Sequence, residues 1–178
     1  MPKMKIVQRG DATLVVPEDT KLLDGDVVLD NPNDTRDIWE KMYDAAKEEY
    51  HPEDISPFFQ AHHVVAALES AKTGKIYTGF CIEGASGVMN LCAERVAALN
   101  MYIAEKNLIV RRMIAFRDKP PVDGGGMPCG ACREYFMQAA YENRNMEIMT
   151  DYKTRKTVLL KDIIPNWWGD KRYKKEAK

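Results

Sequence analysis

Four residues in two short segments have side chains that hold metals and move protons. Cys92 is followed two positions later by Glu94, and Cys129 and Cys132 form a Cys-x-x-Cys pair directly after Pro128. Sulfur-rich tetrahedral coordination suits Zn²⁺, and zinc held by three protein ligands keeps its fourth position free for water. We therefore expect Cys92, Cys129 and Cys132 to bind a catalytic zinc ion, with Glu94 handling the protons of that water.

Cys-x-Glu followed by Pro-Cys-x-x-Cys resembles the layout of the zinc deaminases of nucleosides and nucleobases, which implies hydrolysis of a heterocycle that carries an exocyclic amine. Zinc lowers the pKa of bound water from 15.7 towards about 7, which yields hydroxide at neutral pH. The hydroxide attacks the amine-bearing ring carbon. Glu94 takes the water's proton, protonates the ring nitrogen and assists the departing ammonia. Arg95 directly follows Glu94, and we expect it to hydrogen-bond the thiolates and offset their charge.

Other interpretations of the cysteines remain open. A Cys-x-x-Cys pair also occurs in redox motifs and in structural zinc sites. The fourth cysteine, Cys81, lies on an expected strand ahead of the motif. A zinc-binding protein without turnover is therefore an alternative, but a purely structural site has no use for the carboxylate of Glu94.

Composition favours a small-molecule enzyme. The chain has 178 residues and a formal net charge of −1, which suits one sizeable core and gives no basic body for a nucleic-acid polymer. No apolar run reaches the roughly 20 residues that span a bilayer. The amino terminus lacks the long apolar stretch of a signal peptide. We expect a cytoplasmic protein without a membrane or nucleic-acid partner.

Periodicity predicts the elements that carry these residues. A hairpin is expected from Lys5–Gln8 and Thr13–Val16, with Gly10 and Asp11 at its turn. The helix over 91–106 carries an apolar stripe of Val96, Leu99, Ile103 and Ala104. We expect further helices over 34–50 and 130–141, and strands over 64–68, 76–82, 108–116, 146–150 and 157–160.

The order of these elements predicts an α/β domain of one core, in which helices cover a mixed sheet. Residues 1–30 form an N-terminal extension, and residues 31–178 form the zinc-dependent domain. Cys92 and Glu94 then lie in the first turn of one helix, while Cys129 and Cys132 flank the start of another. Helix N-termini favour thiolates through their dipoles and free N–H groups, so two of them aimed at one point suit a thiolate metal site.

From residue 34 to 168 the chain resembles the cytidine deaminase family. Segment 79–86 (Gly-Phe-Cys-Ile-Glu-Gly-Ala-Ser) precedes Cys92-Ala93-Glu94-Arg95 at the spacing of the small three-cysteine cytidine deaminases, which read Gly-x-Asn-Val-Glu-Asn-Ala-Ser before Cys-Ala-Glu-Arg. Segment 66–68 (Ala-Ala-Leu) and segment 163–168 (Ile-Ile-Pro-Asn-Trp-Trp) are similar to that family's Gly-Ala-Ala-Leu strand and its closing Leu-Leu-Pro-x-x-Phe.

The resemblance implies a three-layer α-β-α sandwich around a mixed sheet of about five strands, and a homotetramer. It implies that Cys92, Cys129 and Cys132 bind Zn²⁺ and that Glu94 is the proton shuttle. Glu83 corresponds to the glutamate that holds the ribose hydroxyls. Trp168 corresponds to a C-terminal aromatic residue that reaches an active site, often that of a neighbouring subunit.

Three positions near the expected substrate depart from the family pattern. Cys81 replaces the ribose-binding asparagine, Gly84 replaces a second asparagine, and His62 falls on or near an expected aromatic residue. The loss of one buried hydrogen-bond partner typically costs about 1–3 kcal/mol, enough to change the sugar or side group that is accepted. The sequence therefore predicts deamination of a cytidine-like nucleoside, or of a different amino-heterocycle as in the similar blasticidin S deaminases.

Overall fold

A computed structural model describes residues 4–9, 12–21, 23, 27–29, 34 and 36–176. The chain folds as two compact units, Met1–Asp37 and Ile38–Lys178. The division falls between residues 37 and 38, later in the chain than the boundary at residue 30 that the sequence suggested. The two units are described separately below.

The first unit contains a small antiparallel sheet with the strand order β2-β1-β3. Its strands are β1 (Met4–Arg9), β2 (Ala12–Pro17) and β3 (Val27–Leu29). The expected hairpin is confirmed, since Ile6 pairs with Val15 and Val7 with Leu14. Its expected turn residues, Gly10 and Asp11, lie outside the described residues. Val7 is buried and supplies an apolar centre to this sheet.

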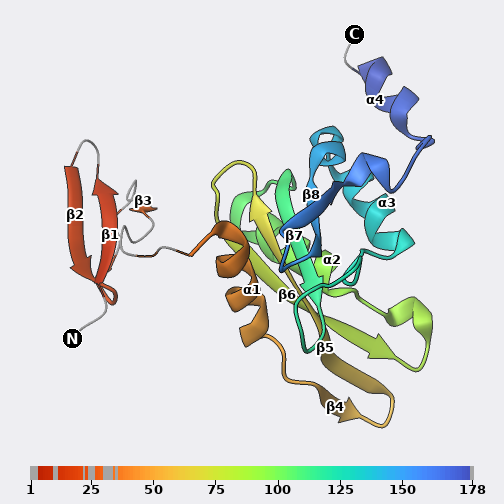
Figure 1. Cartoon of the computed structure of the whole chain (residues 1–178), viewed down its shortest axis with the longest axis horizontal. Helices are drawn as coiled ribbons and strands as arrows, with labels where there is room; N and C mark the ends of the chain where they lie inside the picture. The colour runs from red at the N-terminus through yellow and green to blue at the C-terminus, as the bar shows by residue number, and fades with distance from the viewer. Residues whose placement is uncertain are drawn as a thin grey trace. The chain divides into compact units, whose positions relative to one another are not determined.

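The second unit is built around a mixed six-stranded sheet (Figure 1). Strand β5 pairs with β4, β6 and β7 in antiparallel fashion, β7 pairs with β8 in parallel, and β8 pairs with β9 in antiparallel fashion. The sequence predicted every strand of this sheet except β4, which is too short and too exposed for a clear apolar alternation. The strands are β4 (Glu53–Ser56), β5 (Phe59–Ser70), β6 (Ile76–Gly84), β7 (Val110–Phe116), β8 (Glu147–Asp151) and β9 (Lys156–Leu159).

Helices cover both faces of this sheet and confirm the expected α-β-α layers. Helix α1 (Ile38–Glu48) packs against Val65 and Ala67 on one face. Helices α2 (Ala93–Glu105) and α3 (Gly130–Ala139) share a buried cluster with Leu68 on the other face. Alternate residues of β5 thus serve opposite layers, as strand geometry requires.

Helix α1 begins later than the sequence predicted. Asp34 was an expected cap, but its carboxylate accepts hydrogen bonds from the backbone N–H of Arg36 at 3.1 Å and from the Arg36 guanidinium at 2.9 and 2.8 Å. The other expected cap, Thr35, lies outside the described residues. This contact closes a local turn over residues 34–36, and the helix itself begins at Ile38.

The expected apolar stripe of α2 is wrong. Leu99 and Ile103 are 46% and 68% exposed, whereas alanines such as Ala93 and Ala97 are fully buried against the sheet. The reason lies in strand β6. A Cβ atom at Gly79 would meet the backbone N of Ala97 at 2.4 Å and the carbonyl O of Ala93 at 2.6 Å, so helix and strand are in backbone contact and only small residues fit between them.

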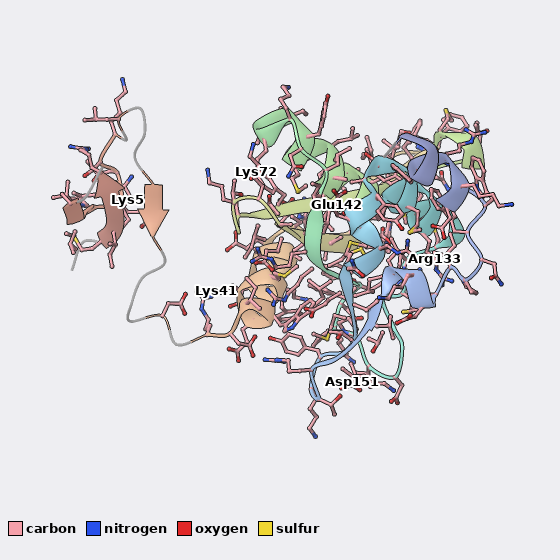
Figure 2. The ribbon with its side chains drawn as sticks, turned by 90° about the horizontal axis from the view of Figure 1, so that it is seen from above. Lys5, Lys41, Lys72, Arg133, Glu142 and Asp151 are labelled. Carbon is pink, nitrogen blue, oxygen red and sulfur yellow. The ribbon has the colours of Figure 1, made fainter. Side chains whose placement is uncertain are left out.

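The two ends of the sheet are marked by Lys72, in the turn after β5, and by Asp151, at the end of β8 (Figure 2). Three short 3-10 helices, η1 (Gly87–Met89), η2 (Tyr141–Asn145) and η3 (Leu160–Asp162), connect the larger elements, and α4 (Asp170–Glu176) follows η3. Among the described residues, the helices lack the combination of length and apolar character needed to cross a membrane.

Candidate active site

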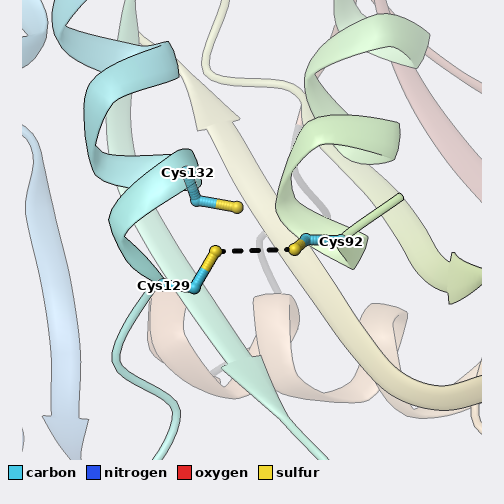
Figure 3. A group of neighbouring side chains, drawn as sticks. All are labelled: Cys92, Cys129 and Cys132. Atoms are coloured by element: carbon cyan, nitrogen blue, oxygen red, sulfur yellow. Dashed lines mark hydrogen bonds between the residues drawn. The ribbon is translucent and has the colours of Figure 1, made fainter. Parts of the chain in front are cut away.

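The three predicted ligands meet where two helices begin (Figure 3). Cys92 is the residue before α2, Cys129 is the residue before α3, and Cys132 lies in the first turn of α3. Their sulfur atoms lie within 4.8 Å of one another, and the Sγ atoms of Cys92 and Cys129 are 3.6 Å apart. Two helix N-termini therefore direct their partial positive charge at one cluster of thiols.

The sulfur positions fit a zinc ion. Tetrahedral coordination with Zn–S bonds of about 2.3 Å places sulfurs about 3.8 Å apart, close to the 3.6 Å between Cys92 and Cys129. Burial raises the pKa of the Cys132 thiol, as do the negative charges of Glu94, Cys92 and Cys129 around it. A bound cation would offset the negative charge of three thiolates gathered at one point, so the donor set fits a metal.

The cysteines differ in how readily they give thiolates. Burial and the hydrogen bond with Cys129 raise the pKa of Cys92. Burial also opposes ionisation of Cys129, but hydrogen bonds from the backbone N–H of Cys132 and from the other two thiols lower its pKa overall. Cys129 is therefore the first of the three to present a negative sulfur.

Glu94 lies beside the sulfurs in the first turn of α2 and is only 6% exposed. Burial raises the pKa of its carboxyl group, against the opposing effects of its own backbone N–H, the Cys132 thiol and the charge of Arg95. A buried carboxyl group whose pKa is shifted towards neutrality is suited to accept and return protons.

Arg95 points back at the cysteine cluster. Its Nη2 atom donates to the carbonyl O of Asn90 at 3.0 Å and lies 3.8 Å from the Sγ of Cys92. Burial alone would lower the pKa of this guanidinium, but the hydrogen bond with Cys92 and the charges of the three cysteines raise it. Arg95 thus supplies positive charge at the edge of the cysteine cluster.

The loop that leads to Cys129 is held from both sides. Gly126 has φ of 77°, and a Cβ atom there would lie 2.0 Å from the carbonyl O of Ala115 in β7, so only glycine fits. Arg133, labelled in Figure 2, donates to the carbonyl oxygens of Pro128 at 2.8 Å and Ile163 at 3.1 Å. These contacts fix the start of α3 and the positions of Cys129 and Cys132.

A cavity of about 210 Å³ opens beside the cluster and is lined by Cys92, Cys129 and Glu94. Cys81 and Glu83 also line it, from the face of β6 that is turned towards α2. The Sγ of Cys81 accepts from the backbone N–H of Val64 at 3.2 Å. Burial, and then the charge and hydrogen bonding of Glu83, raise the pKa of this thiol. Cys81 is therefore a neutral, mostly apolar wall.

Two predicted substrate contacts lie elsewhere. His62 is buried, and its ring is stacked between two others, with ring centroids 3.6 Å apart for Phe80 and 3.7 Å apart for His51. Phe80 packs with the α1 layer, so His62 does not line the cysteine cavity. Trp168 is 57% exposed and donates to Glu134 at 2.8 Å, and it too is absent from the cavity wall.

Sequence reasoning missed Asn90 and a second, larger cavity. The side chain of Asn90 lines the 210 Å³ cavity and accepts from the backbone N–H of Gly84 at 2.7 Å. Asn90 and Glu83 also line an adjoining cavity of about 700 Å³, whose wall includes Asp54, Phe58 and Gln60 of the β4–β5 hairpin. Asn90 could have been found from the sequence, because it is a polar residue two positions before Cys92. Nothing in the sequence of the β4–β5 hairpin indicated that it lines a cavity.

No family model matches the chain, and no curated protein matches it in sequence. Solved structures match it in fold. The cytidine deaminase from Mycobacterium tuberculosis superimposes with a TM-score of 0.54 at 23% identity, covering 74% of this chain and 97% of that one. The cytidine deaminase from Burkholderia pseudomallei gives a TM-score of 0.54 at 25% identity, with 72% and 98% covered. The enzyme from Mycobacterium leprae gives 0.54 at 23% identity, with the same coverage of 72% and 98%. The resemblance expected from the sequence is confirmed, and the chain has the fold of the bacterial cytidine deaminases.

Proposed function

We propose that this chain catalyses the zinc-dependent hydrolytic deamination of a cytidine-like nucleoside. The observation that carries the proposal is Glu94, a carboxylate that is 6% exposed and lines a cavity together with two thiols of a three-cysteine cluster. The fold shared with cytidine deaminases supports a deaminase. A structural metal site has no use for a buried carboxylate at this position.

Cys92, Cys129 and Cys132 would hold the zinc ion, which when bound lowers the pKa of a coordinated water and polarises the site. Glu94 accepts the proton of the attacking water and delivers it to the ring nitrogen of the substrate. It then takes the proton of the hydroxyl that was added to the ring carbon and delivers it to the amine, so that the C–N bond breaks, ammonia leaves and the keto heterocycle remains. A positioned acid/base of this kind typically raises the rate about 10²–10⁴-fold.

The groups around Glu94 favour its role in proton transfer. Burial within the cavity wall raises its pKa, and Arg95 supplies the charge that offsets the thiolates. Glu83 is the group we assign to the sugar hydroxyls of the substrate. Cys81 offers no amide beside it, so fewer hydrogen bonds reach the sugar than in the family pattern.

A second candidate substrate has support of its own. The 700 Å³ cavity that shares Glu83 and Asn90 with the catalytic cavity also contains Asp54, and none of the described residues that line it is basic. An amino-heterocycle with a positively charged substituent would complement these carboxylates. Blasticidin S, a cytosine-containing antibiotic, is the compound to compare with cytidine.

The assembly and the compartment complete the proposal. We infer a homotetramer, supported by the exposed side chains of Leu99, Tyr102 and Ile103 on α2, because apolar patches of this kind mark protein interfaces. We infer the cytoplasm because all four cysteines are free and a reducing compartment keeps zinc-binding thiols available.

The test is the loss of ultraviolet absorbance when zinc-loaded protein is mixed with cytidine, and ammonia release for blasticidin S. Glu94→Ala should lower turnover about 10²–10⁴-fold and retain zinc. Full activity in that variant would refute the catalytic assignment. Asp54→Asn should lower kcat/KM for blasticidin S and leave cytidine turnover unchanged if the second candidate is correct.

A further inference from the structure

All three histidines of the chain lie between residues 51 and 63, and two of them belong to a second cluster of potential metal ligands. One ligand atom from each of His51, Glu53 and His62 lies within 4.8 Å of the others. His62 packs on Phe80, while the next residue of β6, Cys81, faces the cysteine cavity. Because neighbouring strand residues point to opposite faces, this cluster lies across the sheet from the cysteines.

His62 is fixed in the orientation of a metal ligand. Its Nδ1 atom lies 2.7 Å from the carbonyl O of Glu49. Since a carbonyl only accepts, Nδ1 carries the proton and Nε2 keeps a lone pair. Metal-binding histidines commonly donate their other ring N–H to a backbone carbonyl in this way. His62 also has φ of 61°, at a break in the β5 register between Ala61 and Val65, and such backbone conformations concentrate at functional sites.

His51 and Glu53 supply two exposed partners that can adapt. The His51 ring stacks on His62 with 3.7 Å between centroids, and stacked rings direct their lone pairs side by side. His51 must therefore turn for both rings to reach one ion, which its exposed position permits. Glu53 lies on β4 opposite Ala61, next to His62.

We propose that His51, Glu53 and His62 bind a second divalent transition-metal ion, for which Zn²⁺ is the physiological candidate. Two imidazoles and one carboxylate are a donor set that zinc accepts, with water completing the coordination. The ion ties the segment after α1 to β4 and β5. The same hairpin carries Asp54 and Gln60, which line the 700 Å³ cavity, so this ion braces one wall of it.

The test counts metal ions on the full chain. Protein stripped by a chelator under reducing conditions is dialysed against Zn²⁺, and bound zinc is measured by mass spectrometry. Wild type should bind two ions per chain, and His51→Ala and Glu53→Gln should each bind one. Asp54→Asn, which removes the exposed carboxylate next to Glu53, is the matched control and should still bind two. Both test positions are exposed, so these variants should fold, which circular dichroism checks.

Cobalt identifies which ion is lost. Co²⁺ held by thiolates gives an intense sulfur-to-metal band in the near ultraviolet, and Co²⁺ on nitrogen and oxygen ligands does not. His51→Ala should keep the thiolate band and lose one equivalent of cobalt. One ion in the wild type, or two in both variants, would overturn the proposal. Neither result depends on deaminase activity.

Discussion

The two ligand clusters lie on opposite faces of one sheet and are built in opposite ways. The cysteines are held at two helix starts, with Cys132 fully buried. The histidine cluster combines one buried, oriented ring, His62, with two exposed side chains. The first is fixed by secondary structure before any metal arrives, while the second needs His51 to turn. We therefore expect tight, lasting metal binding at the cysteines and weaker, exchangeable binding at the histidines.

The largest effect should come from removing one of the three cysteines, and removing a histidine of the second cluster provides the comparison. Cys129→Ser leaves two thiolates, so the protein should lose its tightly held zinc during dialysis, and deamination should fall at least as far as in Glu94→Ala. His51→Ala should leave that tightly held zinc in place. Zinc retention after dialysis is the measurement. Equal retention in Cys129→Ser and wild type would contradict the assignment of the cysteines.

A smaller effect is expected at Arg95, which has no counterpart in the histidine cluster. Removing a residue that supports metal ligands typically costs 10–100-fold in metal affinity or activity. Arg95→Gln keeps hydrogen-bonding capacity and removes the charge 3.8 Å from the Cys92 sulfur. We expect zinc affinity to fall by about 10–100-fold in a competition titration with a chelator, with a changed pH profile of activity. If both stay as in wild type, Arg95 has no such role.

The helix that carries Cys92 and Glu94 should also be sensitive to a single methyl group. Gly79→Ala puts a Cβ atom 2.4 Å from the backbone of α2, and overpacking of this kind costs about 1–3 kcal/mol. Gly87→Ala is the matched control, because a Cβ atom there meets nothing within 4 Å. Urea unfolding should separate the two variants. Similar stabilities would mean that α2 moves away from β6 without cost.

The smallest effect is expected at the far end of α2, where the stability contributed by Glu105 should depend on pH. Burial opposes ionisation of Glu105, but hydrogen bonds from Thr73, Ser70 and Tyr77 lower its pKa below 4.5. A carboxylate with a depressed pKa stabilises the fold above its unfolded-state pKa, and this contribution is lost as pH falls through the folded-state value.

Glu105→Gln should therefore be less stable by about 1–2 kcal/mol at pH 7, with the difference shrinking below pH 4.5. Thermal unfolding across pH checks this, and the variant should keep its zinc, because Glu105 is far along α2 from Cys92. A difference that persists at low pH would show that packing, not ionisation, is responsible.

The same contrast explains what the sequence could predict. The pairing of Cys129 with Cys132 follows from a local signal, since cysteines three apart at a helix start point at a common centre, and the order of the motif placed Cys92 with them. The histidine cluster depends on a register break in β5 and on the unpredicted strand β4, which are set by tertiary packing. The family resemblance, not the alternation of the strand, suggested His62 as a substrate contact, and the structure stacks its ring with Phe80 and His51.

The outward turn of Leu99 and Ile103 has the same cause. The apolar periodicity of α2 is real, but the close approach at Gly79 requires small residues next to it, and Ala93 and Ala97 occupy those positions. Periodicity measures how apolar residues repeat and carries no information on how near the sheet lies. The α/β class, the mixed sheet and the approximate positions of α2, α3 and most strands were predictable because each rests on a run of several residues.

The close approach at Gly79 has a consequence for how related chains should diverge. The distance between α2 and the sheet depends on the absence of a side chain at Gly79. The position of Cys92, at the start of α2, therefore depends on a residue outside the cysteine cluster. Across relatives, residue 79 should vary as little as Cys92 itself, and Ala93 and Ala97 should be replaced only by residues equally small. A larger residue at position 79 would shift α2 and, with it, Cys92 and Glu94.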